Sequence, residues 1–210
     1  MNSTLLKIIQ ALQFEPLVSA DRIDKLQPLI DYIQKKANHK KDINLNFICT
    51  HNSRRSHLAQ VWAKVAASHF KVERVTCYSG GTEVTALYPK VAETLLSQGF
   101  DVLQIGEGIN PVYAIKYEAN SAPILGFSKK YDSLFNPVSS FAAVLTCSQA
   151  EDACPFIPGA EKRIGLPFED PKSSDLTPEQ SKVYAERSLE IASEMFYVFS
   201  KIKNTECKQN

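Results

Sequence analysis

The chain has 210 residues, of which 44% are hydrophobic and 22% are charged, and its formal net charge is +1. This length and composition predict one globular domain with a sizeable core, or one such domain with an extension. The small net charge excludes a strongly basic nucleic-acid binder, and no apolar run approaches membrane-spanning length. Because the N-terminus lacks the features of a secretion signal, we expect a cytoplasmic protein with no membrane partner.

The cysteine pattern indicates free thiols. The chain has five cysteines, and it has no paired C-x-x-C units that would suggest a zinc site. We therefore expect no metal, and free thiols in a reducing compartment unless redox chemistry is their function. We expect Cys77, within a strand pattern, to be a core residue, and Cys207, near the C-terminus, to have no specific role.

Residues 1–42 predict a helical extension. Apolar residues recur at helical spacing within 3–13 and again after Ser19, a candidate N-cap. Pro28 predicts a kink or a restart in this second helix. The polar run KKANHKKD (35–42) predicts a solvated linker.

From residue 43 to residue 210, strand patterns alternate with helical patterns. This alternation predicts an α/β domain with a parallel sheet that is flanked by helices and covered on both faces. The expected strands are 43–49, 72–79, 100–105 and 142–147, and the expected helices are 57–70, 89–98 and a final one that begins with a capping box at 177–180. The section around Pro111, Pro123 and Pro137 is predicted to be rich in loops. Ligands of such sheets bind beyond the carboxyl ends of the strands, where Cys49 and Cys147 lie.

The segment FICTHNSRRS (47–56) predicts an oxyanion site. A short polar loop between a strand and a helix leaves backbone N–H groups unpaired, and these can surround a tetrahedral anion. The same groups, the helix dipole and Arg55 would favour the thiolate form of Cys49 and make it a nucleophile. A Cys-x5-Arg spacing is common by chance, so its position between a strand and a helix is the informative feature. The expected oxyanion-binding residues are Thr50, His51, Asn52, Ser53, Arg54, Arg55 and Ser56.

Individual side chains of this loop have separate expected roles. Arg55 can hold two oxygens of the anion in bidentate fashion. Ser56 can hydrogen-bond the Cys49 sulfur, and Asn52 can brace the loop from inside. Arg54 would either add to anion affinity or face solvent, and we favour solvent.

The loop resembles the Cys-x5-Arg-Ser loop of the low-molecular-weight tyrosine phosphatases and of the arsenate reductases that share their fold. A second segment, VLTCSQAEDACPFIPGAEKRIGLPFEDP (144–171), contains Cys147, then Cys154 followed by proline, then Asp170-Pro171. Read from its residues alone, this segment could be two core cysteines and a turn. It closely resembles the thioredoxin-coupled arsenate reductases, and it lacks the tyrosines that typically follow Asp-Pro in the phosphatases.

The resemblance implies the low-molecular-weight phosphatase fold and reduction of arsenate to arsenite by a three-cysteine relay. Cys49 would be the nucleophile, Cys147 and Cys154 the second and third redox cysteines, and Asp170 the acid/base. It implies no tightly bound cofactor, with thioredoxin or a similar dithiol protein as reductant and partner. Some members hold potassium with a glutamate where this chain has Gln60, and because an amide is a weaker cation ligand we do not assign potassium.

Two alternatives remain open at the level of sequence. One is a phosphatase that hydrolyses phosphomonoesters through a phosphocysteine, for which the loop and Asp170 would suffice. The other is a non-catalytic sensor that binds an oxyanion and signals through a Cys147–Cys154 bridge, although a sensor would not need Asp170. The sequence indicates no oligomeric state.

Overall fold

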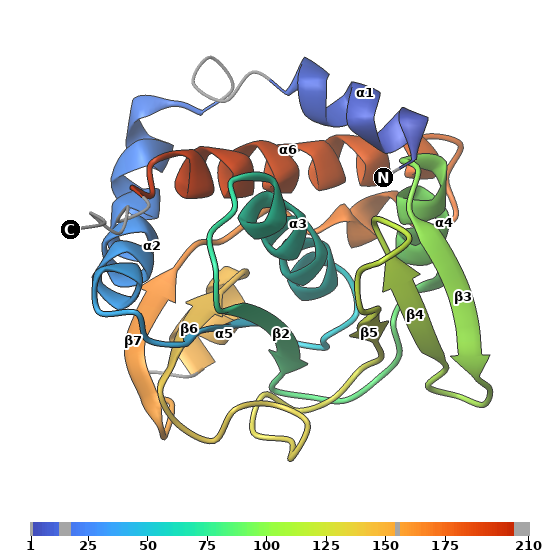
Figure 1. Cartoon of the computed structure of the whole chain (residues 1–210). Helices are drawn as coiled ribbons and strands as arrows, with labels where there is room; N and C mark the ends of the chain where they lie inside the picture. Colours follow the sequence, from blue (N-terminus) through green and yellow to red (C-terminus); the bar gives the residue numbers. More distant parts are fainter. Residues whose placement is uncertain (1, 13–17, 154–155, 204–210) are drawn as a thin grey trace.

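The computed structural model of the chain describes residues 2–12, 18–153 and 156–203 (Figure 1). The helices are α1 (Ser3–Ala11), α2 (Ala20–Asn38), α3 (Arg55–His69), α4 (Pro89–Ser97), α5 (Ser148–Ala153), the 3-10 helix η1 (Pro171–Ser174) and α6 (Gln180–Ser200). The strands are β1 (Ile43–Cys49), β2 (Val75–Gly81), β3 (Asp101–Gly106), β4 (Val112–Lys116), β5 (Ile124–Gly126), β6 (Phe141–Leu145) and β7 (Ala160–Gly165). Within the described residues, no helix combines the length and apolar character needed to cross a membrane.

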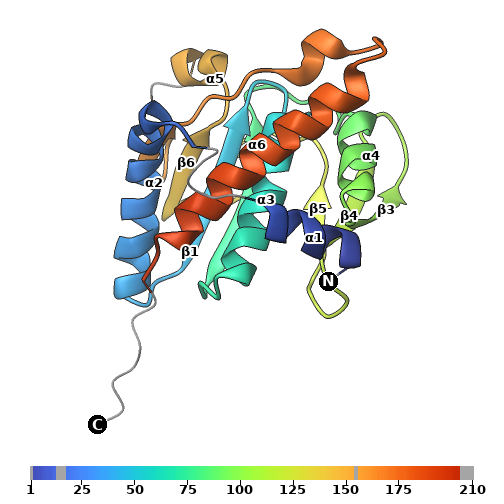
Figure 2. The same cartoon turned by 90° about the horizontal axis from the view of Figure 1, so that it is seen from above.

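The main sheet has four parallel strands in the order β2-β1-β6-β7, which confirms the predicted parallel sheet. The predicted strand 43–49 is confirmed as β1. In the register of β1 with its neighbours, Cys49 lies beside Gly81 and Ile48 beside Leu145. Figure 2 shows α5 and the segment that leads into α6 at the same edge of the molecule as the arrowhead of β1.

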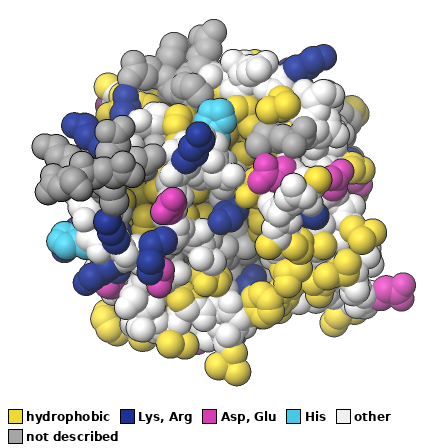
Figure 3. Space-filling view, viewed as in Figure 1, with side chains coloured by type: hydrophobic (Ala, Val, Ile, Leu, Met, Phe, Trp, Pro, Cys, Tyr) yellow, Lys and Arg dark blue, Asp and Glu magenta, His cyan; other side chains and the backbone are white. Residues whose placement is uncertain are grey.

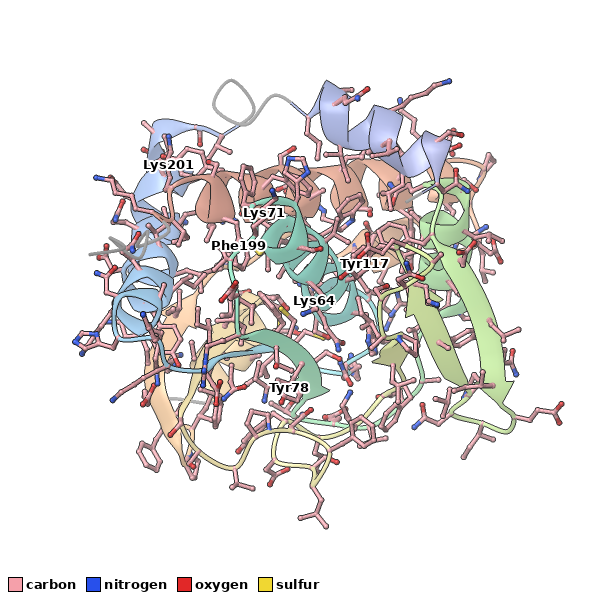
Figure 4. All side chains as sticks on the ribbon, in the orientation of Figure 1. Lys64, Lys71, Tyr78, Tyr117, Phe199 and Lys201 are labelled. Atoms are coloured by element: carbon pink, nitrogen blue, oxygen red, sulfur yellow. The ribbon has the colours of Figure 1, made fainter. Side chains whose placement is uncertain are left out.

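One face of this sheet is covered by helices. Figures 1 and 2 show α6 lying across α3, and Figure 1 shows α2 beside β7. The inner face of α3 belongs to the core, where Trp62 makes edge contacts with Phe100 and Phe196 at ring distances of 5.2 and 6.3 Å. Trp62 Nε1 also donates to Ser188 Oγ on α6 (2.8 Å), so its buried N–H has a partner. Figure 4 shows Lys64 reaching from α3 toward β2, where its ammonium donates to Val75 O (2.8 Å).

The other face is covered by the chain between β5 and β6 rather than by long helices. Asn46 Nδ2 donates to Tyr131 O in this segment (3.1 Å). The backbones approach so closely that a Cβ atom at Gly80 would lie 2.4 Å from Tyr131 Cα. Glycine is therefore required at position 80 for this packing.

The expected strand 100–105 does not join the parallel sheet. It forms β3, which pairs antiparallel with β4, and β4 pairs antiparallel with β5 in a separate three-stranded sheet. The loop-rich expectation for this section was therefore wrong in part, because it contains β4 and β5. A strand inside a parallel sheet is buried on both faces, whereas Leu103 and Ile105 of β3 are largely exposed. Figure 3, viewed as in Figure 1, shows hydrophobic side chains gathered on the side of the molecule where β3, β4 and β5 lie.

The N-terminal residues depart from expectation in two ways. Helix α2 continues through Pro28 without a restart, and it extends to Asn38, so the expected linker 35–42 is half helical. Leu26, Leu29 and Ile33 are fully buried on both sides of the proline, and this packing holds the helix together. Residues of α1 and α2 belong to the same apolar cluster as Ile43, Leu45 and Phe47 of β1.

Helix α6 begins at Gln180, so the expected capping box at 177–180 is wrong. Thr177 Oγ1 donates to Ser174 O (2.8 Å) in the preceding turn instead of capping α6. The inner face of this helix belongs to the core, since Tyr184, Ile191 and Met195 are fully buried.

Candidate active site

The loop between β1 and α3 begins at Cys49, the last residue of β1, and leads into the first turn of α3 at Arg55. Cys49 is 4% exposed, and its Sγ lies 3.2 Å from Ser56 Oγ. In the described part of the chain, the backbone N–H groups of 51–56 have no hydrogen-bond acceptor. Unpaired N–H groups at the N-terminus of a helix can accept a tetrahedral oxyanion.

Asn52 holds the loop in shape from inside. Its side chain is fully buried, with Nδ2 donating to Ser56 Oγ (2.9 Å) and Oδ1 accepting the backbone N–H of Lys129 (2.9 Å). Its φ of 44° lies in the left-handed region, which asparagine tolerates better than most residues. The loop therefore turns at Asn52, and the same side chain fixes the Ser56 hydroxyl beside Cys49.

Arg55 and Asp170 lie together although 115 positions separate them. Arg55 is 8% exposed; its Nη1 donates to Phe168 O (3.0 Å) and its Nη2 to Asp170 Oδ2 (2.5 Å). Asp170 Oδ1 also accepts the N–H of Lys172 at the start of η1 (3.1 Å). The pairing leaves further N–H groups of the guanidinium for a bound anion, with a carboxyl group beside it.

Cys147 borders the same site. In the register of β1 and β6, it lies one residue beyond the position next to Cys49, and adjacent strands are about 4.8 Å apart. Cys147 is 1% exposed, and its Sγ lies 3.5 Å from Thr50 Oγ1 in the loop and accepts the N–H of Ala150 (3.4 Å). A cavity of about 490 Å³ is lined by Arg55, Cys147, Ser148, Gln149, Pro167, Phe168, Glu169 and Asp170.

Arg54 does not face solvent, so that expectation was wrong. Its Nε donates to Tyr184 Oη (2.6 Å), its Nη2 to Asp175 Oδ2 (2.6 Å), and its guanidinium stacks on the ring of Tyr88 (4.1 Å). Burial acts to raise the pKa of Asp175, but hydrogen bonds from Tyr184 and Gln180 and the charge of Arg54 lower it overall. The Arg54 side chain thus ties the loop to the chain that precedes α6.

The other predicted loop residues contribute mainly backbone contacts. His51 O accepts hydrogen bonds from Ser128 Oγ (2.8 Å) and Thr85 Oγ1 (3.1 Å), and the His51 ring pairs with Glu83 (3.3 Å). Ser53 O accepts the N–H of Tyr88 (3.1 Å). The loop is therefore held by neighbouring segments on its outer side.

Two buried residues below the loop were not identified from the sequence as part of its support. His57 Nε2 contacts Asn52 O (2.9 Å), and burial together with the charge of Lys129 lowers the pKa of His57 to about 3, so it is neutral. Lys129 is 5% exposed, and burial lowers its pKa to about 8. Its ammonium lies 4.4 Å from the ring centre of Phe127. No motif signals Lys129, because its position depends on packing far along the chain.

The other cysteines lie apart from the loop or outside the described residues. Cys154 and Cys207 lie outside the described residues. Cys77 is confirmed as a core residue, and burial raises the pKa of its thiol to about 12. Gln60, at the position considered for potassium, donates from Nε2 to Cys77 O (3.0 Å). Across the described ranges, no group of three or more His, Cys, Asp or Glu side chains could hold a metal ion.

The sequence comparisons point to one group of enzymes. No protein-family model matches the chain. The chain is 29% identical over 142 residues to an arsenate reductase of Bacillus licheniformis, a match that covers 67% of this chain and 83% of the relative. It is also 29% identical over 126 residues to an arsenate reductase of Staphylococcus aureus, covering 60% of this chain and 76% of the relative.

The structural comparisons identify the fold. A low-molecular-weight phosphotyrosine phosphatase of Vibrio cholerae superposes with a TM-score of 0.50 at 13% identity, covering 75% of this chain and 94% of the other. A low-molecular-weight protein tyrosine phosphatase of T. tengcongensis gives a TM-score of 0.50 at 14% identity, with 77% and 100% coverage. At such identities the likeness concerns the fold, and it agrees with the parallel four-stranded sheet and its covering helices.

Proposed function

We propose that this chain is an enzyme of the low-molecular-weight phosphatase superfamily, related to the arsenate reductases, and that it reduces arsenate to arsenite with three of its own thiols. The observation that carries the proposal is the position of Cys147. Its thiol borders the same loop as Cys49, in a cavity that Arg55 and Asp170 also line. Hydrolysis of a phosphate ester by Cys49 would not need a second thiol at this place.

In the first step, arsenate would occupy the N–H groups of the loop and the free N–H groups of Arg55. The Cys49 thiolate attacks arsenic, so an S–As bond forms while an As–O bond breaks. Asp170, held beside Arg55, would give its proton to the departing oxygen, which leaves as water. Ser56, at 3.2 Å from Cys49 Sγ, would stabilise the thiolate before attack and when it is released.

In the second step, the Cys147 thiolate attacks Cys49 Sγ. An S–S bond forms and the S–As bond breaks, so the bonding electron pair stays on arsenic, which is reduced from the +5 to the +3 state and leaves as arsenite. In the third step, Cys154 attacks Cys147 Sγ, which releases the Cys49 thiolate and leaves a Cys147–Cys154 disulfide. An external dithiol such as thioredoxin would reduce this disulfide and close the cycle.

A phosphatase is the second candidate, supported by the Arg55–Asp170 pair and the unpaired N–H groups of the loop. These groups would suffice to hydrolyse a phosphomonoester through a phosphocysteine at Cys49. Phosphorus would not accept the electron pair as arsenic does, so the relay cysteines would be idle in this reaction. The two candidates therefore differ in their dependence on Cys147.

The test is arsenate-dependent oxidation of NADPH in the presence of thioredoxin and thioredoxin reductase. We expect turnover by the wild type and by Cys77→Ala, a buried cysteine outside the site that serves as the matched control. Cys49→Ser, Cys147→Ser and Cys154→Ser should each abolish turnover. If Cys147→Ser and Cys154→Ser retain full hydrolysis of an aryl phosphate while the wild type oxidises no NADPH, the chain is a phosphatase.

A further inference from the structure

Arg22, in the first turn of α2, connects the N-terminal helices to the candidate active site. Its Nε and Nη2 donate to the two carboxylate oxygens of Glu194 on α6 (2.7 and 2.6 Å). Its Nη1 donates to the backbone carbonyl of Pro167 (2.9 Å), and its guanidinium stacks on the ring of Phe168 (4.9 Å). The Arg22 guanidinium thus binds Glu194 on α6 and the backbone carbonyl of Pro167 with different N–H groups, while its face lies on the ring of Phe168.

Glu194 is the anchor of this arrangement. It is 3% exposed, and burial raises the pKa of its carboxyl, an effect that the hydrogen bonds and charge of Arg22 oppose. A bidentate pair of this kind fixes the plane of the guanidinium. The pair with Glu194 on α6 therefore fixes the orientation of the Arg22 guanidinium, and with it the hydrogen bond from Nη1 to the Pro167 carbonyl.

Pro167 and Phe168 lead directly to the groups that would handle the anion. The carbonyl of Phe168 accepts Arg55 Nη1 (3.0 Å), and two residues later Asp170 accepts Arg55 Nη2 (2.5 Å). On its other side the segment is tied to the main sheet, because the N–H of Phe168 donates to Thr146 O (3.1 Å). Arg22 supplies the contacts that hold the segment from the side of the N-terminal helices.

From these contacts we propose that Arg22 is a positioning residue, which orients Arg55 and Asp170 by holding Pro167 and Phe168 against α6. The proposal depends on the proposed function in one respect, namely that the reaction takes place at Cys49. It gives the N-terminal helices a part in that chemistry, since Arg22 belongs to α2 and not to the sheet domain. A displacement of 1 Å in a positioning group can cost about a hundredfold in rate, so loss of Arg22 should be measurable.

Two variants separate positioning from stability. Arg22→Lys keeps a cation beside Glu194 but cannot bind both carboxylate oxygens and the Pro167 carbonyl with a rigid fork. Arg22→Met with Glu194→Gln removes the pair without leaving a buried charge unpaired. The matched control is Lys36→Met with Glu161→Gln, which removes another ion pair between α2 and the rest of the chain (2.6 Å), on β7 and away from the segment.

The first readout does not depend on turnover. Iodoacetamide alkylation of Cys49 is measured with increasing inorganic phosphate, because an anion in the loop should protect the thiol. We expect the half-protecting phosphate concentration to rise about fivefold or more in Arg22→Lys and in the double variant, and by less than twofold in the control. The second readout is the kcat of arsenate turnover, which should fall about tenfold in the Arg22 variants and stay within twofold of the wild type in the control.

The outcomes distinguish this proposal from the proposed function. If the wild type is protected by phosphate but does not reduce arsenate, the proposed function fails while the protection series still tests Arg22. If both Arg22 variants fold and match the wild type within twofold in protection and in kcat, Arg22 is not a positioning residue. The same conclusion follows if the Lys36–Glu161 control loses as much protection as the Arg22 variants do.

Discussion

Replacement of Asn52 by alanine should strongly destabilise the protein and disorganise the loop around Cys49. The side chain is fully buried, and both of its polar atoms are used: Nδ2 by Ser56 Oγ and Oδ1 by the N–H of Lys129, each at 2.9 Å. Alanine keeps the backbone bonds of the loop but removes both side-chain contacts at once. It also has to adopt the φ of 44° that asparagine holds here.

The cost can be worked out from these three effects. The Lys129 N–H would lose its acceptor inside the protein, which costs about 1–3 kcal/mol, and loss of the bond to Ser56 costs about 1 kcal/mol. The left-handed backbone adds about 1 kcal/mol for alanine. The free energy of unfolding of Asn52→Ala should therefore be about 3–5 kcal/mol below that of the wild type. The loss in Asn52→Gly should be about 1 kcal/mol smaller, because glycine adopts this φ freely.

Urea unfolding of the wild type and the two variants measures these differences directly. Phosphate protection of Cys49 against iodoacetamide, followed on the folded proteins, should weaken in both variants since Ser56 and the loop lose their internal brace. A loss below about 1 kcal/mol for Asn52→Ala, or a glycine variant no more stable than the alanine variant, would refute this account of the loop.

Two further predictions concern the charged residues around the loop. Burial lowers the pKa of Lys129 from 10.5 to about 8, so between these pH values the unfolded chain binds this proton and the native state does not. The free energy of unfolding of the wild type, relative to Lys129→Met, should therefore rise by up to about 3 kcal/mol from pH 8 to 10.5. If urea unfolding gives the same pH dependence for both proteins, Lys129 does not have this lowered pKa. Arg54→Met leaves Asp175 without its cation and should lower the free energy of unfolding by about 3 kcal/mol. It should weaken phosphate protection of Cys49 less than Arg55→Met does. If it weakens protection more than Arg55→Met, Arg54 binds the anion.

The loop and its flanking elements could be predicted because their signals are contiguous. An apolar run, a short polar segment and a helical pattern follow one another from β1 to α3, so the position of Cys49 at a strand end did not depend on distant contacts. The expected strand 100–105 was real, but its sheet was assigned wrongly. Its partner is the strand Val112–Lys116, and nothing in an alternating pattern of strands and helices tells a crossover from a hairpin.

The support of the site was harder to predict than its reactive groups. Cys147 and Asp170 stand in a recognisable segment, whereas Arg22 contacts Glu194 across 172 positions of sequence. An arginine in an amphipathic helix ordinarily belongs to the solvated face, so the sequence around Arg22 does not predict its hydrogen bond to the Pro167 carbonyl. Lys129 is similar, because it is buried and has no carboxylate partner among the described residues, which contradicts the usual placement of lysine.

The most direct test of the proposed relay is a single turnover of the reduced Cys154→Ser variant with arsenate and no external reductant. Without its third thiol the relay should stop after the second step. The account predicts one arsenite released per protein and a Cys49–Cys147 disulfide, identified by mass spectrometry of the unreduced peptides. Release of no arsenite, with both thiols still free to alkylate, would contradict the claim that Cys147 attacks Cys49 in this site.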